Sequence, residues 1–395
     1  MSPHDTSSAS PTLTITGARI LTESGFEDGV VRIEDGLITE ITGSEGARQG
    51  ERIDGHGCLL LPGIVDLHGD AFERSLNPRP GVRFAPELGF DEADRLMTAF
   101  GITTALHGLT CSWEPGLRGT ESFAAMARAL RDLKPRLRCD THIHLRFEIH
   151  THDGVGTALP LIEDGTVRVL AFNDHLEATE KDMAIPERAD LYPARTGVDL
   201  DVFKALLSEV RKSASRIDQT VSILADAANR AGVALLSHDD PDLETRAHYR
   251  ALGARIAEFP LTRDVAANAR EHGEHVVMGA PNALRGRSHK ATNPSASDMI
   301  SAGLCSVLST DYYYPAPLHA AFRLARDGVL PLEKAWELVS AHPAEALGFT
   351  DRGRIEKGLR ADLVLVDAGA DMTASPEVMA TVAAGTPVFQ TARRR

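Results

Sequence analysis

An alternation of short apolar runs with segments of helical periodicity constrains the fold of this chain more than any other feature of its sequence. Between the runs, apolar residues recur at helical spacing, as at Phe123, Met126 and Leu130. Eight such runs alternating with helices predict an α/β fold, a (β/α)₈ TIM barrel over residues 61–345. The expected strands cover residues 63–67, 102–107, 137–147, 167–173, 233–237, 255–259, 275–278 and 304–309.

The two ends of the chain differ from this middle region. Short β-rich runs separated by glycines fill residues 12–41, and a similar texture returns after residue 353. Because chain ends often lie close together, the two pieces can form one sheet domain. We therefore expect a small β-sandwich domain built from residues 12–60 plus 346–395.

Composition restricts the partners and the compartment. The 42 Lys and Arg against 56 Asp and Glu give a net charge of −14, which argues against nucleic-acid binding. No apolar run reaches the roughly 18 residues that a membrane span needs, and the polar N-terminal residues contain no apolar signal region. Four cysteines in 395 residues make no disulfide framework. These observations favour a cytoplasmic protein without a membrane or nucleic-acid partner; a homo-oligomer is left open.

Potential metal ligands stand where several expected strands end, and a barrel of this kind carries its active site at those ends. His68 and Asp70 close the first strand two residues apart, so both side chains point the same way. His175 and His238 each follow an apolar run and adjoin carboxylates, and Asp311 closes the eighth strand. Imidazole and carboxylate groups can share divalent ions. Two such ions can activate a water, and a neighbouring carboxylate can move its proton.

The third expected strand is unusual because its polar and apolar residues alternate strictly. Its apolar positions suit packing under helices, whereas the polar positions would face the barrel axis, which is normally apolar. Buried polar groups need partners, and a metal and an anion would supply them; Glu148 is the best ligand candidate. The alternative is an exposed edge with a solvated face. The polar positions are His142, His144, Arg146, Glu148 and His150.

Basic residues gather in two segments that follow the first and seventh strands. Arg74 and Arg79 lie in one, and Arg285 and Arg287 in the other, which contains no acidic residue from position 281 to 290. In an acidic chain this clustering indicates an anionic ligand, because guanidinium groups match phosphate oxygens. Ordinary solvated loops are the alternative interpretation, since the prolines and glycines there also make turns.

Residues 61–68, Leu-Pro-Gly-Ile-Val-Asp-Leu-His, resemble the strand-one signature of the amidohydrolase superfamily. More narrowly, several blocks between residues 60 and 325 resemble the PhnM family, the α-D-ribose 1-methylphosphonate 5-triphosphate diphosphatases of phosphonate catabolism. The blocks are residues 68–74 with 78–81, 146–148, 237–240, 258–260, 279–282 with 285–286 and 288–289, and 309–313.

The resemblance implies an amidohydrolase-type barrel that hydrolyses the triphosphate ester to the 5-phosphate and pyrophosphate. It implies one or two divalent ions (Zn, Mn or Mg), with Asp311 activating the water and His238 as a second catalytic residue. Asp70 stands where many superfamily members have His, and a carboxylate shifts the preference toward Mn²⁺ or Mg²⁺. The implied metal ligands are His68, Asp70, Glu148, His175, His238 and Asp311. The residues expected to bind a small phosphorylated substrate are Arg74, Arg79, Arg146, Asn282, Arg285, Arg287 and His289.

Two other functions stay open. A carbon–nitrogen hydrolase, such as a deacetylase or cyclic amidase, would share the metal ligands without requiring all the arginines of the two basic segments. A non-catalytic barrel scaffold would have lost ligands, whereas every expected position here is filled. The long connection after the fourth strand, residues 176–200, has room for an active-site lid.

Overall fold

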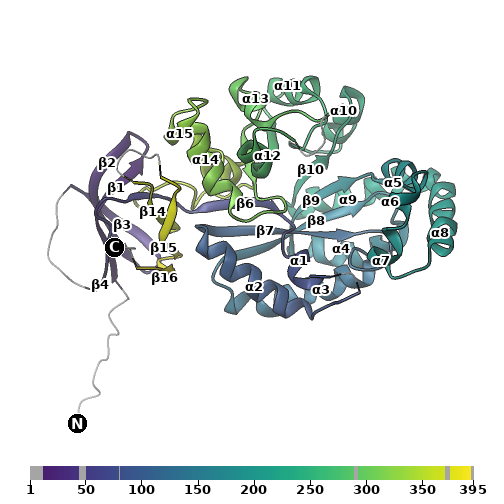
Figure 1. The fold of residues 1–395 in the computed structure, drawn as a ribbon, viewed down its shortest axis with the longest axis horizontal. Helices are drawn as coiled ribbons and strands as arrows, with labels where there is room; N and C mark the ends of the chain where they lie inside the picture. The colour runs from purple at the N-terminus through teal and green to yellow at the C-terminus, as the bar shows by residue number, and fades with distance from the viewer. Residues whose placement is uncertain (1–11, 44–49, 80, 289–291, 370–373, 393–395) are drawn as a thin grey trace, which may run out of the picture.

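The structure is a computed structural model that describes residues 12–43, 50–79, 81–288, 292–369 and 374–392. His289, one of the expected substrate-binding residues, lies outside these ranges. Figure 1 shows a small β-rich part at one end of the molecule, where the purple and yellow chain ends meet, and a larger α/β part beside it.

The larger part contains an eight-stranded sheet in which each strand runs parallel to its neighbours, in the order of the sequence. The eight expected strands are confirmed, with β7 four residues longer than expected because its end pairs with β8 as far as Cys111. The strands are β6 (Ile64–Gly69), β7 (Ile102–Cys111), β8 (Asp140–Glu148), β9 (Val167–Asn173), β10 (Ala234–His238), β11 (Ile256–Glu258), β12 (His275–Gly279) and β13 (Val307–Ser309).

The barrel closes differently at its two ends. At the carboxyl ends of the strands, the N–H of Asp311 donates to His68 O, and the N–H of Asp70 donates to Asp311 O, both at 2.9 Å. Lower down, the segment at Leu338 and Val339 lies between β13 and β6 and accepts hydrogen bonds from both strands. The barrel is therefore closed without an intervening segment at the edge that carries the site.

Seven of the eight strands contribute apolar residues to the barrel interior, whereas β8 contributes polar ones. Residues such as Val65, Leu106, Val169 and Leu236 form an inner cluster to which β8 contributes none of its described residues. Instead, His144 of β8 is fully buried in the interior. The apolar residues of β8 pack outward against the helices. The expectation for this strand is thus confirmed, except for His150, which follows the end of β8 and does not face the axis.

Helices cover the outside of the barrel because each has one apolar face. In α3, Phe123, Met126, Ala127 and Leu130 are buried, as their spacing predicts. The helices are α1 (Glu73–Leu76), α2 (Pro86–Ala99), α3 (Thr120–Leu133), α4 (Val155–Glu163), α5 (Leu176–Met183), α6 (Pro186–Ala189), α7 (Tyr192–Thr196), α8 (Leu200–Lys212), α9 (Ile217–Ala231), α10 (Leu243–Ala251), α11 (Arg263–Glu271), α12 (Ala280–Arg285), α13 (Ala296–Ser301), α14 (Ala316–Arg326), α15 (Leu332–Glu337) and α16 (Ala341–Ala346), with 3₁₀ turns η1 (Lys134–Arg136), η2 (His152–Gly154) and η3 (Ala214–Arg216).

The small part takes its strands from both chain ends, as expected, and these strands form one continuous hydrogen-bonded sheet. A bulge between Thr16 and Ala18 divides β1, so that its first half pairs with β4 and its second half with β5. β5 also pairs with β14, which joins the two chain ends. The strands are β1 (Thr12–Thr22), β2 (Gly25–Glu34), β3 (Leu37–Thr42), β4 (Glu51–Asp54), β5 (Leu59–Pro62), β14 (Leu363–Asp367), β15 (Glu377–Ala383) and β16 (Thr386–Gln390).

Asp140, at the start of β8, pairs with two arginines that precede β14. Its Oδ2 lies 2.7 Å from Nη1 of Arg352 and 3.2 Å from Nη1 of Arg360, and its Oδ1 lies 3.1 Å from Nε2 of His142. Although burial opposes ionisation, the hydrogen bond with His142 and the nearby arginine hold the pKa of Asp140 well below its usual range. The pairs fix the C-terminal segment to the bottom of the barrel, opposite the site.

All four cysteines are free and buried. Among the residues described, no helix has both the length and the apolar character needed to cross a membrane.

Candidate metal centre

Three strands of the barrel are followed, within two residues of their ends, by a residue other than glycine that has a left-handed backbone conformation. Asp239, Phe259 and Asp311 have φ values of 57°, 53° and 53°. In each, the N–H still donates to the neighbouring strand, at Glu258 O, Val277 O and His68 O respectively. Such conformations are strained and persist where the surrounding structure enforces them, often at functional sites. All three residues line one cavity at the carboxyl ends of the strands.

Glu258, the last residue of β11, connects the histidines of two other strands. Its Oε1 lies 2.9 Å from Nδ1 of His68, and its Oε2 lies 2.6 Å from Nδ1 of His238. Burial alone would raise the pKa of Glu258, but the adjacent histidines hold it well below its usual range. Because the carboxylate accepts a hydrogen from each Nδ1, each Nε2 is left with a lone pair, as in metal-binding histidines oriented by a carboxylate.

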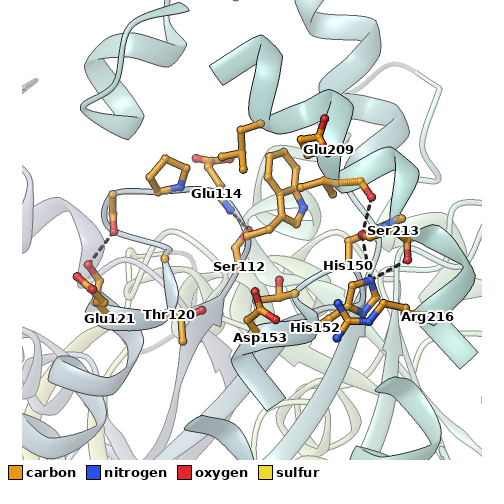
Figure 2. Close-up of a pocket in the computed structure, with 18 of the residues that line it drawn as sticks. Ser112, Glu114, Thr120, Glu121, His150, His152, Asp153, Glu209, Ser213 and Arg216 are labelled. Carbon is orange, nitrogen blue, oxygen red and sulfur yellow. Dashed lines mark hydrogen bonds between the residues drawn. The ribbon is translucent and has the colours of Figure 1, made fainter. Parts of the chain in front are cut away.

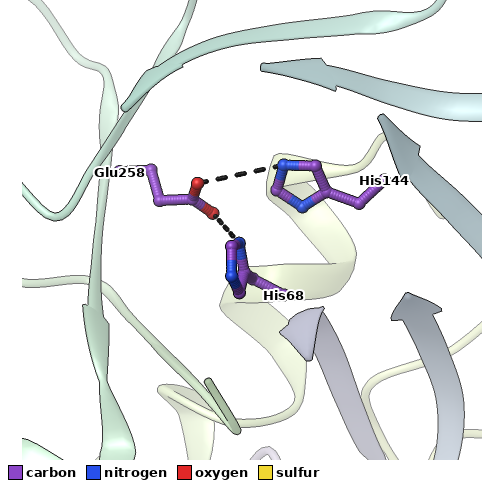
Figure 3. Close-up of side chains that lie close together, drawn as sticks. All are labelled: His68, His144 and Glu258. Atoms are coloured by element: carbon purple, nitrogen blue, oxygen red, sulfur yellow. Dashed lines mark hydrogen bonds and ion pairs between the residues drawn. The ribbon is translucent and has the colours of Figure 1, made fainter. Parts of the chain in front are cut away.

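Figure 3 shows that His144 also points toward Glu258. Its Nδ1 lies 3.0 Å from Leu67 O and therefore donates to it. Its Nε2 lies 3.8 Å from Oε2 of Glu258 and has no hydrogen-bond partner among the residues that the structure describes. Burial lowers the pKa of His144 to about 3, so the ring is neutral. Its Nε2 thus carries a buried lone pair beside a carboxylate.

Glu148 and His175 form a second pair at the neighbouring strand ends. Nδ1 of His175 is hydrogen-bonded to Oε1 of Glu148, and the backbone N–H of His175 donates to Oε2 at 3.2 Å. His175 precedes α5 directly, so this pair fixes the point where the long connection leaves the barrel.

Asp70 and Asp311 face the same cavity from the closing strands. Nη1 of Arg146 lies 3.2 Å from Oδ2 of Asp70. Burial raises the pKa of Asp311 to about 6, and the negative charge of Asp70 acts in the same direction. Gly279, at the end of β12, leaves room for this side chain, since a Cβ there would lie 3.0 Å from Oδ2 of Asp311.

The arrangement fits divalent metal ions. Possible ligand atoms of His68, Asp70 and Asp311 lie within 4.8 Å of one another, as do those of His175, His238 and Asp239. Several carboxylates converge here, and Arg146 contacts one of them, Asp70. The lone pair on Nε2 of His144 lies beside them and has no donor among the described residues. Imidazole and carboxylate donors of this kind bind Zn²⁺ and related ions. A cation there would compensate charges that are otherwise costly to bury.

The expected metal ligands lie together. His68, Asp70, His175, His238 and Asp311 line a cavity of about 220 Å³, the metal cavity, and Glu148 adjoins it through His175. Glu258, His144 and Asp239 received no role from the sequence. Glu258 also closes an apolar run, so the rule applied to the other strand ends could have found it.

The expected substrate-binding residues separate into two groups. Arg146 and Asn282 line the metal cavity, although both amide atoms of Asn282 are used by Pro294 O and the N–H of Ala296. Arg74 contacts the ring of Tyr312, a lining residue, at 5.8 Å. The exposed arginines outside the lining are Arg74, Arg79, Arg285 and Arg287.

The fold and the site together define a class, the metal-dependent hydrolases with a (β/α)₈ barrel. This chain belongs to the amidohydrolase family, whose model matches residues 92–389.

Among curated proteins, the chain is 33% identical to the α-D-ribose 1-methylphosphonate 5-triphosphate diphosphatase of Escherichia coli (strain K12), over 89% of this chain and 94% of that one. It is 24% identical to a dihydroorotase of Syntrophotalea carbinolica, over 94% and 93% of the two chains. Among solved structures, dihydropyrimidinase from Brevibacillus agri superposes with a TM-score of 0.64 at 14% identity, covering 96% of this chain and 95% of that one. The last match shows the shared fold.

Proposed function

We propose that this chain hydrolyses α-D-ribose 1-methylphosphonate 5-triphosphate to the 5-phosphate and pyrophosphate, in phosphonate catabolism. The observation that carries the proposal is the similarity to the diphosphatase of Escherichia coli, which extends over nearly the whole length of both chains. The arginines near the strand ends support it, because an anionic substrate needs cations close to the reacting phosphorus.

The residues in and beside the metal cavity have different roles in the proposed reaction. His68, Asp70, Glu148, His175, His238 and Asp311 would hold one or two divalent ions, Zn, Mn or Mg, which supply Lewis acidity and an activated water when bound. Asp311 accepts a proton from the attacking water at a carboxylate oxygen and returns it to the departing phosphate oxygen. Glu258 keeps His68 and His238 in the tautomer that presents Nε2. The bond between the α and β phosphoryl groups breaks, and pyrophosphate leaves.

The test is pyrophosphate release from this triphosphate by protein loaded with Zn²⁺, Mn²⁺ or Mg²⁺ in turn. We expect release by the wild type, none from His238→Ala, and a loss of about 10²–10⁴-fold in Asp311→Asn, the range for a general acid–base residue. Wild-type protein that holds metal but releases no pyrophosphate would exclude the substrate.

Carbon–nitrogen hydrolysis is a second candidate, and the similarity to dihydroorotase favours it. The same metal-loaded protein can be tested with dihydroorotate and with a hydantoin. Hydrolysis of a cyclic amide, without pyrophosphate release from the triphosphate, would move the assignment to this class.

A further inference from the structure

A second cavity, of about 160 Å³, adjoins the metal cavity. Arg146 and His175 line both, and we call the second one the arginine cavity because Arg118, Arg146 and Arg195 all border it. Arg118 comes from the connection between β7 and α3, and Arg195 from α7. The segment 176–200 thus forms part of the wall, through helices α5 and α7.

The carboxylates that line the arginine cavity are already paired with cations. Glu114 lies 2.6 Å from Arg195, and Asp182 lies 2.7 Å from Arg188. Glu148 is hydrogen-bonded to His175. Glu114 and Asp182 therefore do not need a cation from a ligand in this cavity, whereas Glu148 is one of the expected metal ligands.

Three donor groups of residues that line this cavity have no acceptor among the described residues. They are the hydroxyl of Thr110, Nε1 of Trp113 and Nε of Arg146, all buried. Thr110 is 6% and Arg146 7% exposed, so both side chains are shielded from bulk solvent. The Trp and Arg groups can only donate. An unsatisfied buried donor is costly, so three of them in one cavity call for a ligand that carries several acceptor oxygens.

The neighbouring cavities are chemically different. The metal cavity is also lined by Phe259, Pro260 and Met278, which offer apolar surfaces against which a sugar ring can pack. A larger outer cavity has a volume of about 570 Å³ and shares Ser112, Trp113 and Glu114 with the arginine cavity. Figure 2 shows side chains that line this outer cavity. Its wall carries two arginines against four carboxylates, whereas the arginine cavity has three of each, so the outer cavity is less suited to an anion.

We infer that the arginine cavity binds the pyrophosphate part of the substrate, while the sugar lies against Phe259 and Pro260 in the metal cavity. The inference rests on the proposed function and adds the orientation of the substrate to it. The α-phosphorus then lies between the two cavities, beside His175 and Arg146, which line both. Pyrophosphate offers acceptor oxygens to Thr110, Trp113 and Arg146 together. Arg118 and Arg195 are paired with Glu73 and Glu114, and each guanidinium group has N–H donors beyond those pairs.

The experiment measures binding, not turnover. Inorganic pyrophosphate is titrated calorimetrically into metal-loaded wild type, Thr110→Val and Trp113→Phe, with metal content and thermal unfolding determined for each. We expect each variant to weaken pyrophosphate binding roughly tenfold, which corresponds to about 1.4 kcal/mol. Binding of ribose 5-phosphate, which represents the sugar end, should stay within about twofold of the wild type.

Two matched variants complete the design. Thr151→Val removes an equally buried, unpartnered hydroxyl from the wall of the outer cavity and should leave pyrophosphate binding unchanged. Thr110→Ser keeps the hydroxyl and should bind as the wild type does, even if Thr110→Val folds poorly. Wild-type affinity in Thr110→Val and Trp113→Phe, or equal weakening in Thr151→Val, would overturn the inference.

The result is separable from the proposed function. In one outcome, the variants weaken pyrophosphate binding as expected but the protein does not hydrolyse the triphosphate. That outcome would contradict the proposed substrate and support the pyrophosphate site. In the other outcome, the protein hydrolyses the triphosphate, but substitution of Thr110 or Trp113 does not change pyrophosphate binding. That outcome would support the proposed function and contradict the pyrophosphate site.

Discussion

Glu258 accepts a hydrogen bond from His68 across 190 residues of sequence, with 2.9 Å between Oε1 and Nδ1 and both side chains buried. The other carboxylate oxygen binds His238 in the same way, so one residue orients two expected metal ligands.

Glu258→Gln should therefore weaken metal binding while the fold is kept. A glutamine has one acceptor oxygen, and its NH₂ group would force the second histidine to donate from Nε2 instead of presenting a lone pair. We expect metal affinity to fall about 10–100-fold, the usual effect of losing such a carboxylate. Competition with a chelator measures it.

Glu274→Gln is the matched control. Glu274 is also a buried carboxylate, but it pairs with Arg246 and Arg250 away from the metal cavity. This control should lower the melting temperature and leave metal affinity unchanged. Wild-type affinity in Glu258→Gln would show that the carboxylate does not orient the ligands.

Gly279→Ala should impair catalysis through Asp311. The new Cβ would lie 3.0 Å from Oδ2 of Asp311, so the carboxylate must move by a few tenths of an ångström. We expect kcat to fall roughly tenfold, because small displacements of reacting groups are costly. The control is Gly156→Ala, where a Cβ meets no atom within 4 Å. Equal kcat values in the two variants would contradict the assignment of Asp311.

Thr310→Val should destabilise the closing edge of the barrel. The hydroxyl of Thr310 donates to Oδ2 of Asp66 at 2.6 Å, and burial raises the pKa of that carboxyl. Loss of the donor leaves a buried oxygen unsatisfied, at a cost of about 1–3 kcal/mol in the free energy of unfolding. Urea unfolding measures the change. Thr310→Ser retains the hydroxyl and should lose much less stability; equal losses would show that packing, not the hydrogen bond, matters here.

Asp140→Asn should reduce stability in a pH-dependent way. The folded pKa of Asp140 lies below that of the unfolded chain, about 3.9, so the unfolded state binds more protons as the pH falls. The stabilisation by Arg352 and Arg360 is then complete well above pH 4 and is lost as the pH falls below it. We expect the variant to be about 2 kcal/mol less stable at pH 7.

Urea midpoints of the wild type and Asp140→Asn between pH 8 and 3.5 test this linkage. The gap between them should stay constant from pH 8 to about 5 and narrow below about pH 4. A gap that stays the same across the whole range would mean that the ionised carboxylate contributes nothing.

Much of the fold follows from local pattern. Strand and helix periodicities are properties of neighbouring residues, so the eight strands and the two-ended small sheet could be predicted without knowing what packs on what. The ligand candidates at strand ends followed from the same reasoning, because parallel strands bring their carboxyl ends to one edge. His68, His175, His238 and Asp311 were found this way.

What the sequence determined by itself is therefore the set of elements and the type of residue at each strand end. Only the tertiary structure decided which side chains meet. It places Glu258 between His68 and His238. It also places Arg118 and Arg195 in the same cavity wall as Arg146, whereas the arginines of the two basic segments are not part of that wall. Such contacts depend on barrel closure, on register and on where long connections return to the sheet. The reason is physical, since periodicity is set within a few residues, whereas pairing across a barrel is set by elements far apart in the chain.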